Sequence, residues 1–312
     1  MTDAIGLLDG QMFYDGTMYD NIKAGKLLEE VFAAAGFEKY VIEEDVYNIE
    51  LSGYLGVMSC RECVKAICFA CGAEATDTKS DTLTIRHPDR YVKHTVGTNR
   101  KISGSTNVSL EQYVSGVAIE CSNYIPGKVE NEIYNGTLDK GLTRLTFDIP
   151  YDKDTITSIG GTIVKASTNY VDINMEETGV CVIKGVGYEE KGFTYQKNVN
   201  ILPAGTKVNV QKFGKCTLYN TALIPKIAEK LLDYYSLQKV LEMRFFAENE
   251  SAGNWLNVSN VNGMTSYTML EEQTIDLASG IISTARCRGY NVVVTELYFT
   301  GTELYAGGVG LI

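Results

Sequence analysis

The cysteines of one short stretch are the residues best placed for chemistry. Residues 59–72 read S-C-R-E-C-V-K-A-I-C-F-A-C-G, which gives Cys60, Cys63, Cys68 and Cys71 a C-x2-C-x4-C-x2-C spacing. Thiolates are zinc ligands, but structural zinc sites usually join two C-x2-C pairs through a longer loop, so that four sulfurs converge. In a helix rising 1.5 Å per residue the outer two cysteines lie about 16 Å apart. One zinc ion therefore cannot bind all four unless the helix is broken.

The same stretch has the signals of a capped helix. Ser59 and Glu62 are spaced as a capping box, and Gly72 suits the left-handed residue that ends many helices. On a helical wheel one arc of about 140° holds the four cysteines, Val64 and Ile67, while Arg61, Glu62 and Lys65 lie outside it. Free cysteine often packs as a small apolar residue, so we predict that these side chains fill a core, with a metal or redox site as the alternative. Phe69 lies opposite and is expected to meet a second element.

The histidines offer a second possible site. A Ser–His–Asp or Cys–His arrangement needs a histidine beside a nucleophile, and the chain has only His87 and His94, which flank P-D-R-Y. Two such residues can form a general base pair or ligate a metal ion. The polar surroundings favour a simpler interpretation, namely a polar loop at the edge of a domain.

Paired carboxylates and aromatic residues could both serve carbohydrate chemistry. A glycosidase needs two carboxylates across a cleft. The candidate pairs are Glu43/Glu44, Glu176/Glu177, Glu189/Glu190 and Glu271/Glu272. Each is expected in a loop or on a solvent face. Twenty tyrosines, with Tyr234-Tyr235 adjacent, fit packing and interfaces better than sugar stacking. We predict no catalytic, cofactor-binding or metal-binding residue, and therefore no enzyme.

The composition limits the partners. The chain has 312 residues and a formal net charge of −11 at pH 7, which argues against binding to nucleic acid or to an anionic membrane. No stretch of about 18 apolar residues is present, and the N-terminus lacks the pattern of a signal peptide. Half of the eight cysteines lie in one helix and the rest are scattered singly, which favours a reducing compartment.

The periodicity of apolar residues predicts the elements. In the first part we expect a helix over 22–35, an extended stretch over 40–42, an acidic loop over 43–45, and a hairpin of 73–76 with 82–86 around a turn at 79–81. Beyond residue 94 the period changes to two. There we expect strands over 117–121 and 145–149 with a polar loop over 127–141, followed by short strands over 154–199 with turns at 160–161, 179 and 185–187. Beyond these we expect a helix from about 222, and then strands over 239–247, 264–276, 280–290 and 291–300.

These elements predict an α+β, mostly β fold. A small α+β domain with two amphipathic helices is expected over residues 1–90, inserted beside β-barrel-like or sandwich domains. A β-rich domain is expected over 91–221. Residues 222–312 are expected to supply a helix followed by antiparallel strands that complete a β-barrel-like domain.

Two stretches resemble tail proteins of phages and prophages of Firmicutes. R-E-C-V-K-A-I-C-F-A-C-G-A, followed by S-D-T-L-T-I, is similar to their R-E-A-L-x-x-I-A-F-A-x-G-A and S-D-x-I-x-I, in which small apolar residues stand at the positions of Cys63 and Cys68. Residues 222–289, with E-M-R-F-F, A-G-N-W-L-N-V and D-L-A-S-G-I, resemble the closing region of the same proteins. Asn254 replaces an aspartate of that pattern, and Ser279-Gly280-Ile281 replaces Gly-Gly-Phe.

The wider family is similar to baseplate hub proteins of contractile phages, including late control protein D. The resemblance implies a virion structural protein that is assembled in the bacterial cytoplasm and resides in the tail. Its implied partners are further copies of itself, as a homotrimeric ring of β-barrel-like domains, together with the tail tube and the central spike. It also implies an additional N-terminal portion in family members, and it carries no catalytic residues, cofactor or metal.

Two alternatives remain open. The first is a carbohydrate-binding module at the tail tip that recognises a host surface glycan, which requires an exposed aromatic platform. The second is an enzyme that degrades cell-wall material, for which no carboxylate can be nominated.

Overall fold

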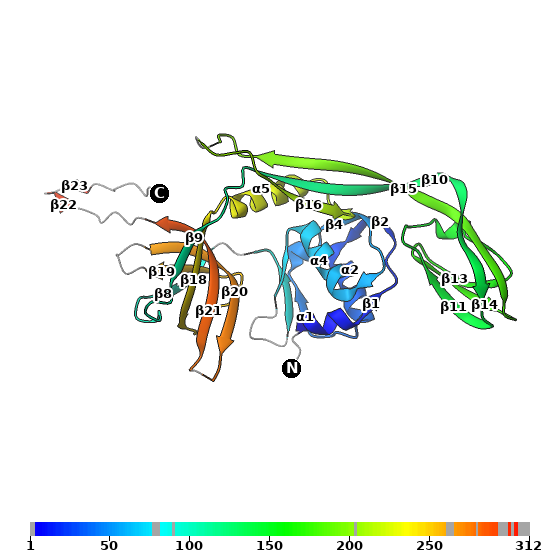
Figure 1. Ribbon diagram of the computed structural model, residues 1–312, viewed down its shortest axis with the longest axis horizontal. Helices are drawn as coiled ribbons and strands as arrows, with labels where there is room; N and C mark the ends of the chain where they lie inside the picture. The colour runs from blue at the N-terminus through cyan, green and yellow to red at the C-terminus, as the bar shows by residue number, and fades with distance from the viewer. Residues whose placement is uncertain are drawn as a thin grey trace. The chain divides into compact units, whose positions relative to one another are not determined.

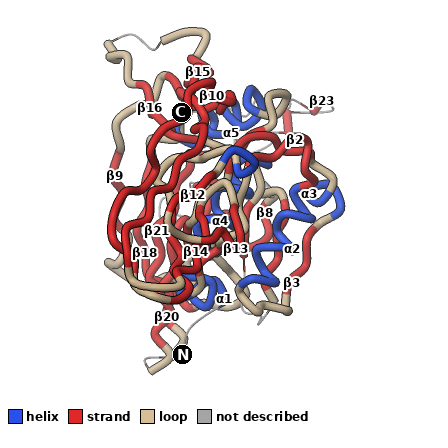
Figure 2. The backbone as a smooth tube through the Cα atoms, turned by 90° about the vertical axis from the view of Figure 1, so that its right-hand side faces the viewer, coloured by secondary structure: helices blue, strands red, loops and turns tan. Residues whose placement is uncertain are grey.

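The chain adopts the mostly-β α+β class that the sequence predicts. The computed structural model describes residues 4–76, 82–88, 91–202, 205–259, 265–278, 280–292, 299–300 and 303–304. Strand is the dominant secondary structure among them (Figure 2). The chain divides into two compact units: Met1–His87, Val117–Lys197 and Gln211–Glu229 form unit 1, and Pro88–Gly116, Asn198–Val210 and Lys230–Ile312 form unit 2.

Unit 1 contains most of the helices and several small sheets. Its helical segments are α1 (Ala4–Leu7), η1 (Leu8–Gly10), α2 (Ala24–Ala34), α3 (Glu44–Tyr47), α4 (Cys60–Cys71) and η2 (Lys153–Thr155), and α5 (Ile224–Tyr235) begins in it. Its strands are β1 (Met12–Phe13), β2 (Met18–Lys23), β3 (Tyr40–Ile42), β4 (Glu50–Tyr54), β5 (Met58–Ser59), β6 (Glu74–Thr76), β7 (Leu83–Arg86), β10 (Gly116–Leu138), β11 (Gly141–Thr146), β12 (Thr157–Ile159), β13 (Thr162–Ala166), β14 (Tyr170–Met175), β15 (Gly179–Asn198), β16 (Val210–Cys216) and β17 (Leu218–Tyr219).

Helix α4 begins and ends where its capping residues predict. The Ser59 side chain accepts a hydrogen bond from the backbone N–H of Glu62 at 3.2 Å. Gly72 is left-handed, with φ 64° and ψ 33°. The second half of the capping box is replaced by an ion pair, because the Glu62 carboxylate contacts Lys65 Nζ at 2.7 Å. The local sequence therefore determines this helix from end to end.

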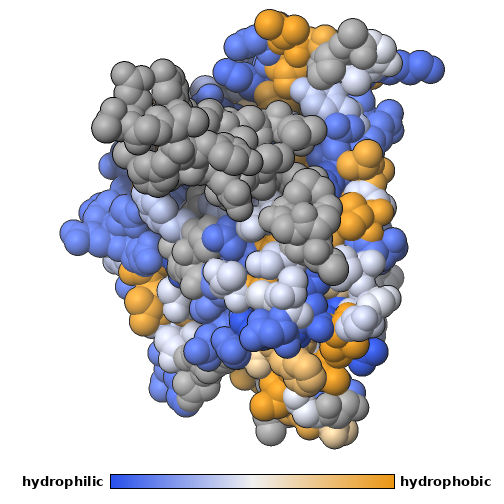
Figure 3. Space-filling model, turned by 90° about the vertical axis from the view of Figure 1, so that its left-hand side faces the viewer, coloured by the Kyte–Doolittle hydropathy of each residue, from blue (hydrophilic) through white to orange (hydrophobic). Residues whose placement is uncertain are grey.

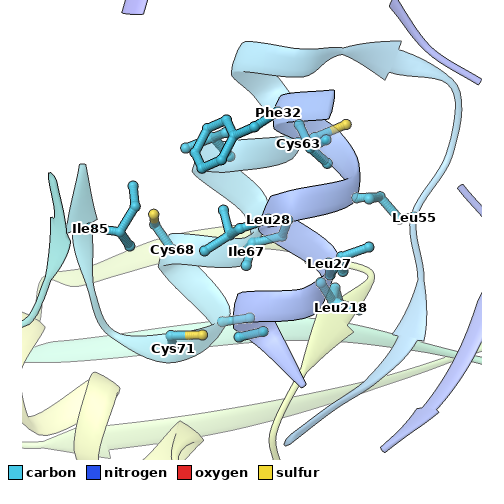
Figure 4. Packing of buried hydrophobic residues seen from close by; sticks show 14 of the residues in the cluster. Leu27, Leu28, Phe32, Leu55, Cys63, Ile67, Cys68, Cys71, Ile85 and Leu218 are labelled. Atoms are coloured by element: carbon cyan, nitrogen blue, oxygen red, sulfur yellow. The ribbon is translucent and has the colours of Figure 1, made fainter. Parts of the chain in front are cut away.

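The cysteine face of α4 packs against α2 in the core of unit 1. Figure 4 shows Cys63, Ile67 and Cys68 among side chains of α2 such as Leu28 and Phe32. All four cysteines of α4 are at most 6% exposed. On the other side of the helix, Phe69 stacks on Phe213 of β16, with ring centroids 6.1 Å apart. The expected burial of the cysteines in a core and the expected second contact of Phe69 are both confirmed.

Two long strands, β10 and β15, are neighbours in the four-stranded sheet β12-β15-β10-β16 (Figure 1). The expected polar loop over 127–141 is wrong, since β10 continues to Leu138, and the expected turn over 185–187 is wrong, since those residues lie inside β15. Most side chains of this part of β10 are exposed, so no apolar alternation marks it as a strand. A Cβ on Gly127 would lie 2.4 Å from the carbonyl oxygen of Gly187, so this glycine permits close approach of the backbones.

In the three-stranded sheet β11-β14-β13, the central strand β14 is buried on both of its faces. Val171 and Ile173 lie in one apolar cluster of unit 1. Nearby, the fully buried Asn169 donates from its Nδ2 to the carbonyl oxygens of Gly16 and Leu55, and accepts a hydrogen bond from the Tyr54 hydroxyl. Hydrogen bonds of the buried Asn169 amide therefore connect this sheet to the N-terminal part of unit 1.

Unit 2 is built on one six-stranded sheet in the order β8-β19-β20-β21-β18-β9. The strands are β8 (Val92–Val96), β9 (Asn107–Leu110), β18 (Lys239–Phe246), β19 (Trp255–Ser259), β20 (Thr265–Asp276) and β21 (Ile282–Val292), with the two-stranded ribbon β22 (Phe299–Thr300) and β23 (Glu303–Leu304) beyond them. One face carries a fully buried row that includes Leu241, Phe245 and Cys287. The sheet is open, as are all the sheets formed by the described residues.

Most other expectations about elements hold. Helix α5 carries Pro225 in its first turn, and β20 and β21 form the expected hairpin. The acidic loop over 43–45 is wrong, because Glu44 and Asp45 open α3, where carboxylates favour a helix N-terminus. The turn at 79–81 and most of 291–300 lie outside the described residues. Among the described helices, none has the length and apolar character needed to cross a bilayer.

Candidate assembly surface

The buried cysteines of α4 are poor candidates for chemistry. Burial raises the pKa of each of these thiols, and that of Cys68 to about 12. Their thiolates are therefore scarce at neutral pH, which disfavours nucleophilic attack by these cysteines. Within the part of the chain that the structure describes, no three histidine, cysteine or acidic side chains are grouped as metal ligands.

The two histidines belong to different units. His87 Nδ1 lies 3.1 Å from the carbonyl oxygen of Gly72, and its Nε2 lies 3.7 Å from Asp45. The first segment of unit 1 ends at His87. His94 lies within β8, where it pairs with Leu256, and not in a loop. The predicted polar loop is therefore correct for the first histidine and wrong for the second.

One of the four glutamate pairs is not on a solvent face as expected. The Glu271 side chain is only 12% exposed. Its Oε2 accepts a hydrogen bond from Arg286 Nε at 2.9 Å, its Oε1 accepts one from Arg288 Nε at 2.6 Å, and the Tyr234 hydroxyl also donates to it. Glu111 contacts both arginines at 2.5 Å. We call Glu111, Tyr234, Glu271, Arg286 and Arg288 the ionic cluster of unit 2.

A β-bulge explains why the sequence alone does not predict the position of Glu271. The register of β20 against β21 shifts between Leu270, which pairs with Cys287, and Glu272, which pairs with Arg286. The extra residue, Glu271, is thereby turned toward the side chains of both arginines. No local sequence signal reveals a bulge of this kind, because it exists only in the pairing of two strands.

One row of aromatic residues in unit 2 is packed. Trp255 is 8% exposed and stacks on Tyr267 at 4.6 Å between centroids, and Tyr267 meets Tyr290 at 5.3 Å. Tyr234 and Tyr235 contact each other edge to face at 4.9 Å. Since Trp255 is covered, this row does not present the exposed platform that sugar stacking requires.

The edge strand β9 is a surface feature that packing within unit 2 leaves unexplained. Its residues read N-V-S-L and all are exposed; Val108 is 53% and Leu110 77% exposed. Val108 pairs with Leu241, which lies on the buried face of the sheet. The apolar row of that face therefore continues onto an uncovered edge. Figure 3 shows that apolar residues reach the surface at several places on the face that it presents.

The backbone of β9 is also free along its outer side. Among the described strands, β18 is the one that pairs with it. The Glu111 N–H donates to the Gln238 carbonyl oxygen at 2.8 Å, and hydrogen-bonded and non-hydrogen-bonded pairs alternate along an antiparallel ladder. The backbone groups of Val108 and Leu110 therefore point away from β18.

Two properties make this edge suitable for pairing with another strand. Natural edge strands are usually protected by charges, proline or bulges, and β9 contains no charged residue and no proline. Its end is fixed, because Glu111 follows it directly and contacts Arg286 and Arg288. A preformed edge with exposed apolar side chains can add a strand with little ordering cost.

Comparison with known proteins gives matches at the level of structure alone. No protein-family model and no curated protein matches the sequence. A tail protein from Neisseria meningitidis MC58 matches with a TM-score of 0.50 and 12% identity, over 91% of this chain and 71% of that one. The 43 kDa tail protein of prophage MuSo2 from Shewanella oneidensis gives 0.48 and 10%, over 90% and 70%. Prophage tail protein gp18 from Listeria monocytogenes EGD-e gives 0.46 and 9%, over 90% and 68%.

These solved structures are all tail proteins. At 12% identity the likeness to the Neisseria meningitidis protein concerns the fold, and it extends over nearly the whole chain. The chain therefore has the fold of a protein from a tail assembly.

Proposed function

We propose that this chain is a structural component of a phage or prophage tail, of the baseplate hub or tail-tip type, and that it acts by assembly and not by catalysis. The observation that carries the proposal is the fold shared with the Neisseria meningitidis tail protein over 91% of the chain. The motifs over 61–73 and 222–289, which resemble hub proteins, support the same class.

The proposed mechanism is association of protomers through strand edges. Val108 and Leu110 carry apolar side chains and unpaired backbone groups on the same edge, so a strand from a second copy can satisfy both. Head-to-tail contacts of this kind form a ring when the rotation between copies closes. We propose a homotrimer, whose further partners are the tail tube and the spike, with assembly in the bacterial cytoplasm.

The mass in solution tests this proposal directly. Light scattering across a concentration series should give three times the 34.3 kDa of one chain. A mass that stays at 34.3 kDa at all concentrations would contradict association through this chain alone.

A further inference from the structure

Two cysteines that are far apart in the sequence meet in the four-stranded sheet of unit 1. Cys121 lies on β10 and Cys216 ends β16, and these strands are neighbours in that sheet. The two side chains lie close enough for each thiol to shift the pKa of the other. Both also line the same cavity of about 10 Å³, with Phe69 and Ile227 among its apolar walls. This cavity is too small for any ligand, so the thiols have each other as reaction partners.

The two thiols differ in access and acidity. Cys216 is partly exposed, whereas Cys121 is 2% exposed. The Cys121 side chain lowers the pKa of Cys216, whereas the Cys216 side chain, with burial, raises that of Cys121. Cys216, which is accessible and has the stabilised thiolate, is therefore suited to attack an oxidant. Its protonated neighbour Cys121 is suited to resolve the mixed disulfide that forms.

We propose that Cys121 and Cys216 form a disulfide when the protein meets a low-molecular-weight disulfide such as oxidised glutathione. The Cys216 thiolate attacks one sulfur of the oxidant, a mixed disulfide forms, and one glutathione leaves as a thiol. Cys121 then gives up its proton and attacks the Cys216 sulfur, which releases the second glutathione. Two protein thiols are oxidised and one glutathione disulfide is reduced. Residues directly opposite each other on adjacent strands have Cα atoms about 5 Å apart, which is within the Cα range of disulfides.

The other described cysteines are less suited to this reaction. Cys60 and Cys63, and likewise Cys68 and Cys71, stand three residues apart in one helix and are buried in the core. Cys181 and Cys287 belong to separate apolar clusters. Burial raises the pKa of each of these thiols, so their thiolates are scarce at neutral pH.

The experiment counts thiols in the full chain. Reduced protein is incubated with oxidised glutathione, quenched, unfolded and alkylated, and the intact mass and the digested peptides are measured. The expected result is the loss of two of eight alkylation sites and one linked peptide pair that contains Cys121 and Cys216. Retention of all eight sites, or a link between Cys60 and Cys63 or between Cys68 and Cys71, would overturn the proposal.

Serine variants separate the two steps. Cys121→Ser should stop at a mixed disulfide, with one glutathione on Cys216, whereas Cys216→Ser should keep all seven remaining thiols. Cys181→Ser, on the neighbouring strand β15, is the matched control and should form the same disulfide as the unchanged protein. If a serine variant fails to fold, the peptide map of the unchanged chain still decides the question. Glutathione that remains on Cys216 of the unchanged chain, with no link to Cys121, would contradict the second step.

Discussion

Oε1 of Glu271 accepts a hydrogen bond from Nε of Arg288 at 2.6 Å, and the two side chains are 12% and 8% exposed. Removing one member of a buried pair leaves the other charge without compensation. We expect Glu271→Ala to lower the free energy of unfolding by about 3–5 kcal/mol, measured by urea denaturation. Glu248→Ala is the matched control in unit 2, because its carboxylate pairs with Arg100 but is 66% exposed, and it should cost at most about 1 kcal/mol. If both variants lowered the free energy of unfolding by the same amount, burial would add nothing to the stability that the ionic cluster contributes.

Unit 2 should lose stability in acid. Burial raises the pKa of the Glu271 carboxyl, but hydrogen bonds from Tyr234, Arg286 and Arg288 outweigh burial and hold this pKa below its usual range. Burial also raises the pKa of Glu250, and hydrogen bonds from the Glu248 N–H and from Arg100 outweigh it in the same way. A carboxylate whose pKa is lower in the folded state binds more protons when unfolded, so its contribution is present at neutral pH and lost as the pH falls below about 4.

Thermal unfolding followed from neutral pH into acid checks this expectation. In Glu271→Gln the acid-dependent loss of stability should be smaller than in the unchanged chain, because one titrating group is gone. An unchanged pH profile in that variant would assign the acid sensitivity to other carboxylates.

Gly25 should not tolerate a methyl group although it lies in helix α2. Alanine is normally favoured over glycine in a helix interior by about 1 kcal/mol. Here a Cβ would lie 1.9 Å from Cδ2 of Tyr47. We expect Gly25→Ala to lower the free energy of unfolding by about 1–3 kcal/mol, as overpacking does. Gly10→Ala, whose Cβ meets nothing within 4 Å, should change it by no more than about 0.5 kcal/mol.

Cys63→Ala distinguishes a core residue from a metal ligand. Cys63 is fully buried in the apolar core of unit 1, so its truncation should cost about 1–2 kcal/mol. Loss of a structural zinc ion would cost on the order of 10 kcal/mol. Denaturation with and without a chelator, together with the metal content of the purified protein, separates the two. A stoichiometric metal or a large chelator effect would contradict the packing interpretation.

Charge on β9 should prevent association without unfolding the protomer. Leu110 is 77% exposed, so Leu110→Lys removes no buried contact within the chain and places a cation on the proposed contact edge. Light scattering should show the mass fall from that of the oligomer to that of one chain, with unchanged circular dichroism. Leu142→Lys, at a position 65% exposed on β11, is the control and should keep the oligomer. A normal oligomer in Leu110→Lys would exclude β9 as the contact.

The predictability of each element depends on how local its causes are. Helix α4 could be placed from sequence because Ser59, Gly72 and the apolar arc between them act within a dozen residues. The exposed half of β10 could not, because its side chains have no buried face and Gly127 resembles a loop residue until the backbone of Gly187 lies against it.

The position of β9 at the edge of its sheet also depends on residues far away in the sequence. The exposed apolar residues of β9 can be read from the sequence only as part of an irregular segment, because the strand is short. Its role as an edge follows from pairing with β18, more than a hundred residues away. Glu271 likewise acquires its partners through a register shift that no single strand contains.

The interleaving of the two units has a consequence for synthesis. Leu218 belongs to the apolar core built by α2 and α4, and its strand β17 pairs with β4 at Gly53. A ribosome must therefore add more than a hundred residues, including the first segment of unit 2, before the core begun by α2 and α4 can be completed. A nascent chain released before Leu218 exposes an unfinished apolar surface. Fragments of the gene that end earlier should yield chaperone-bound or aggregated polypeptide, and not a folded N-terminal domain.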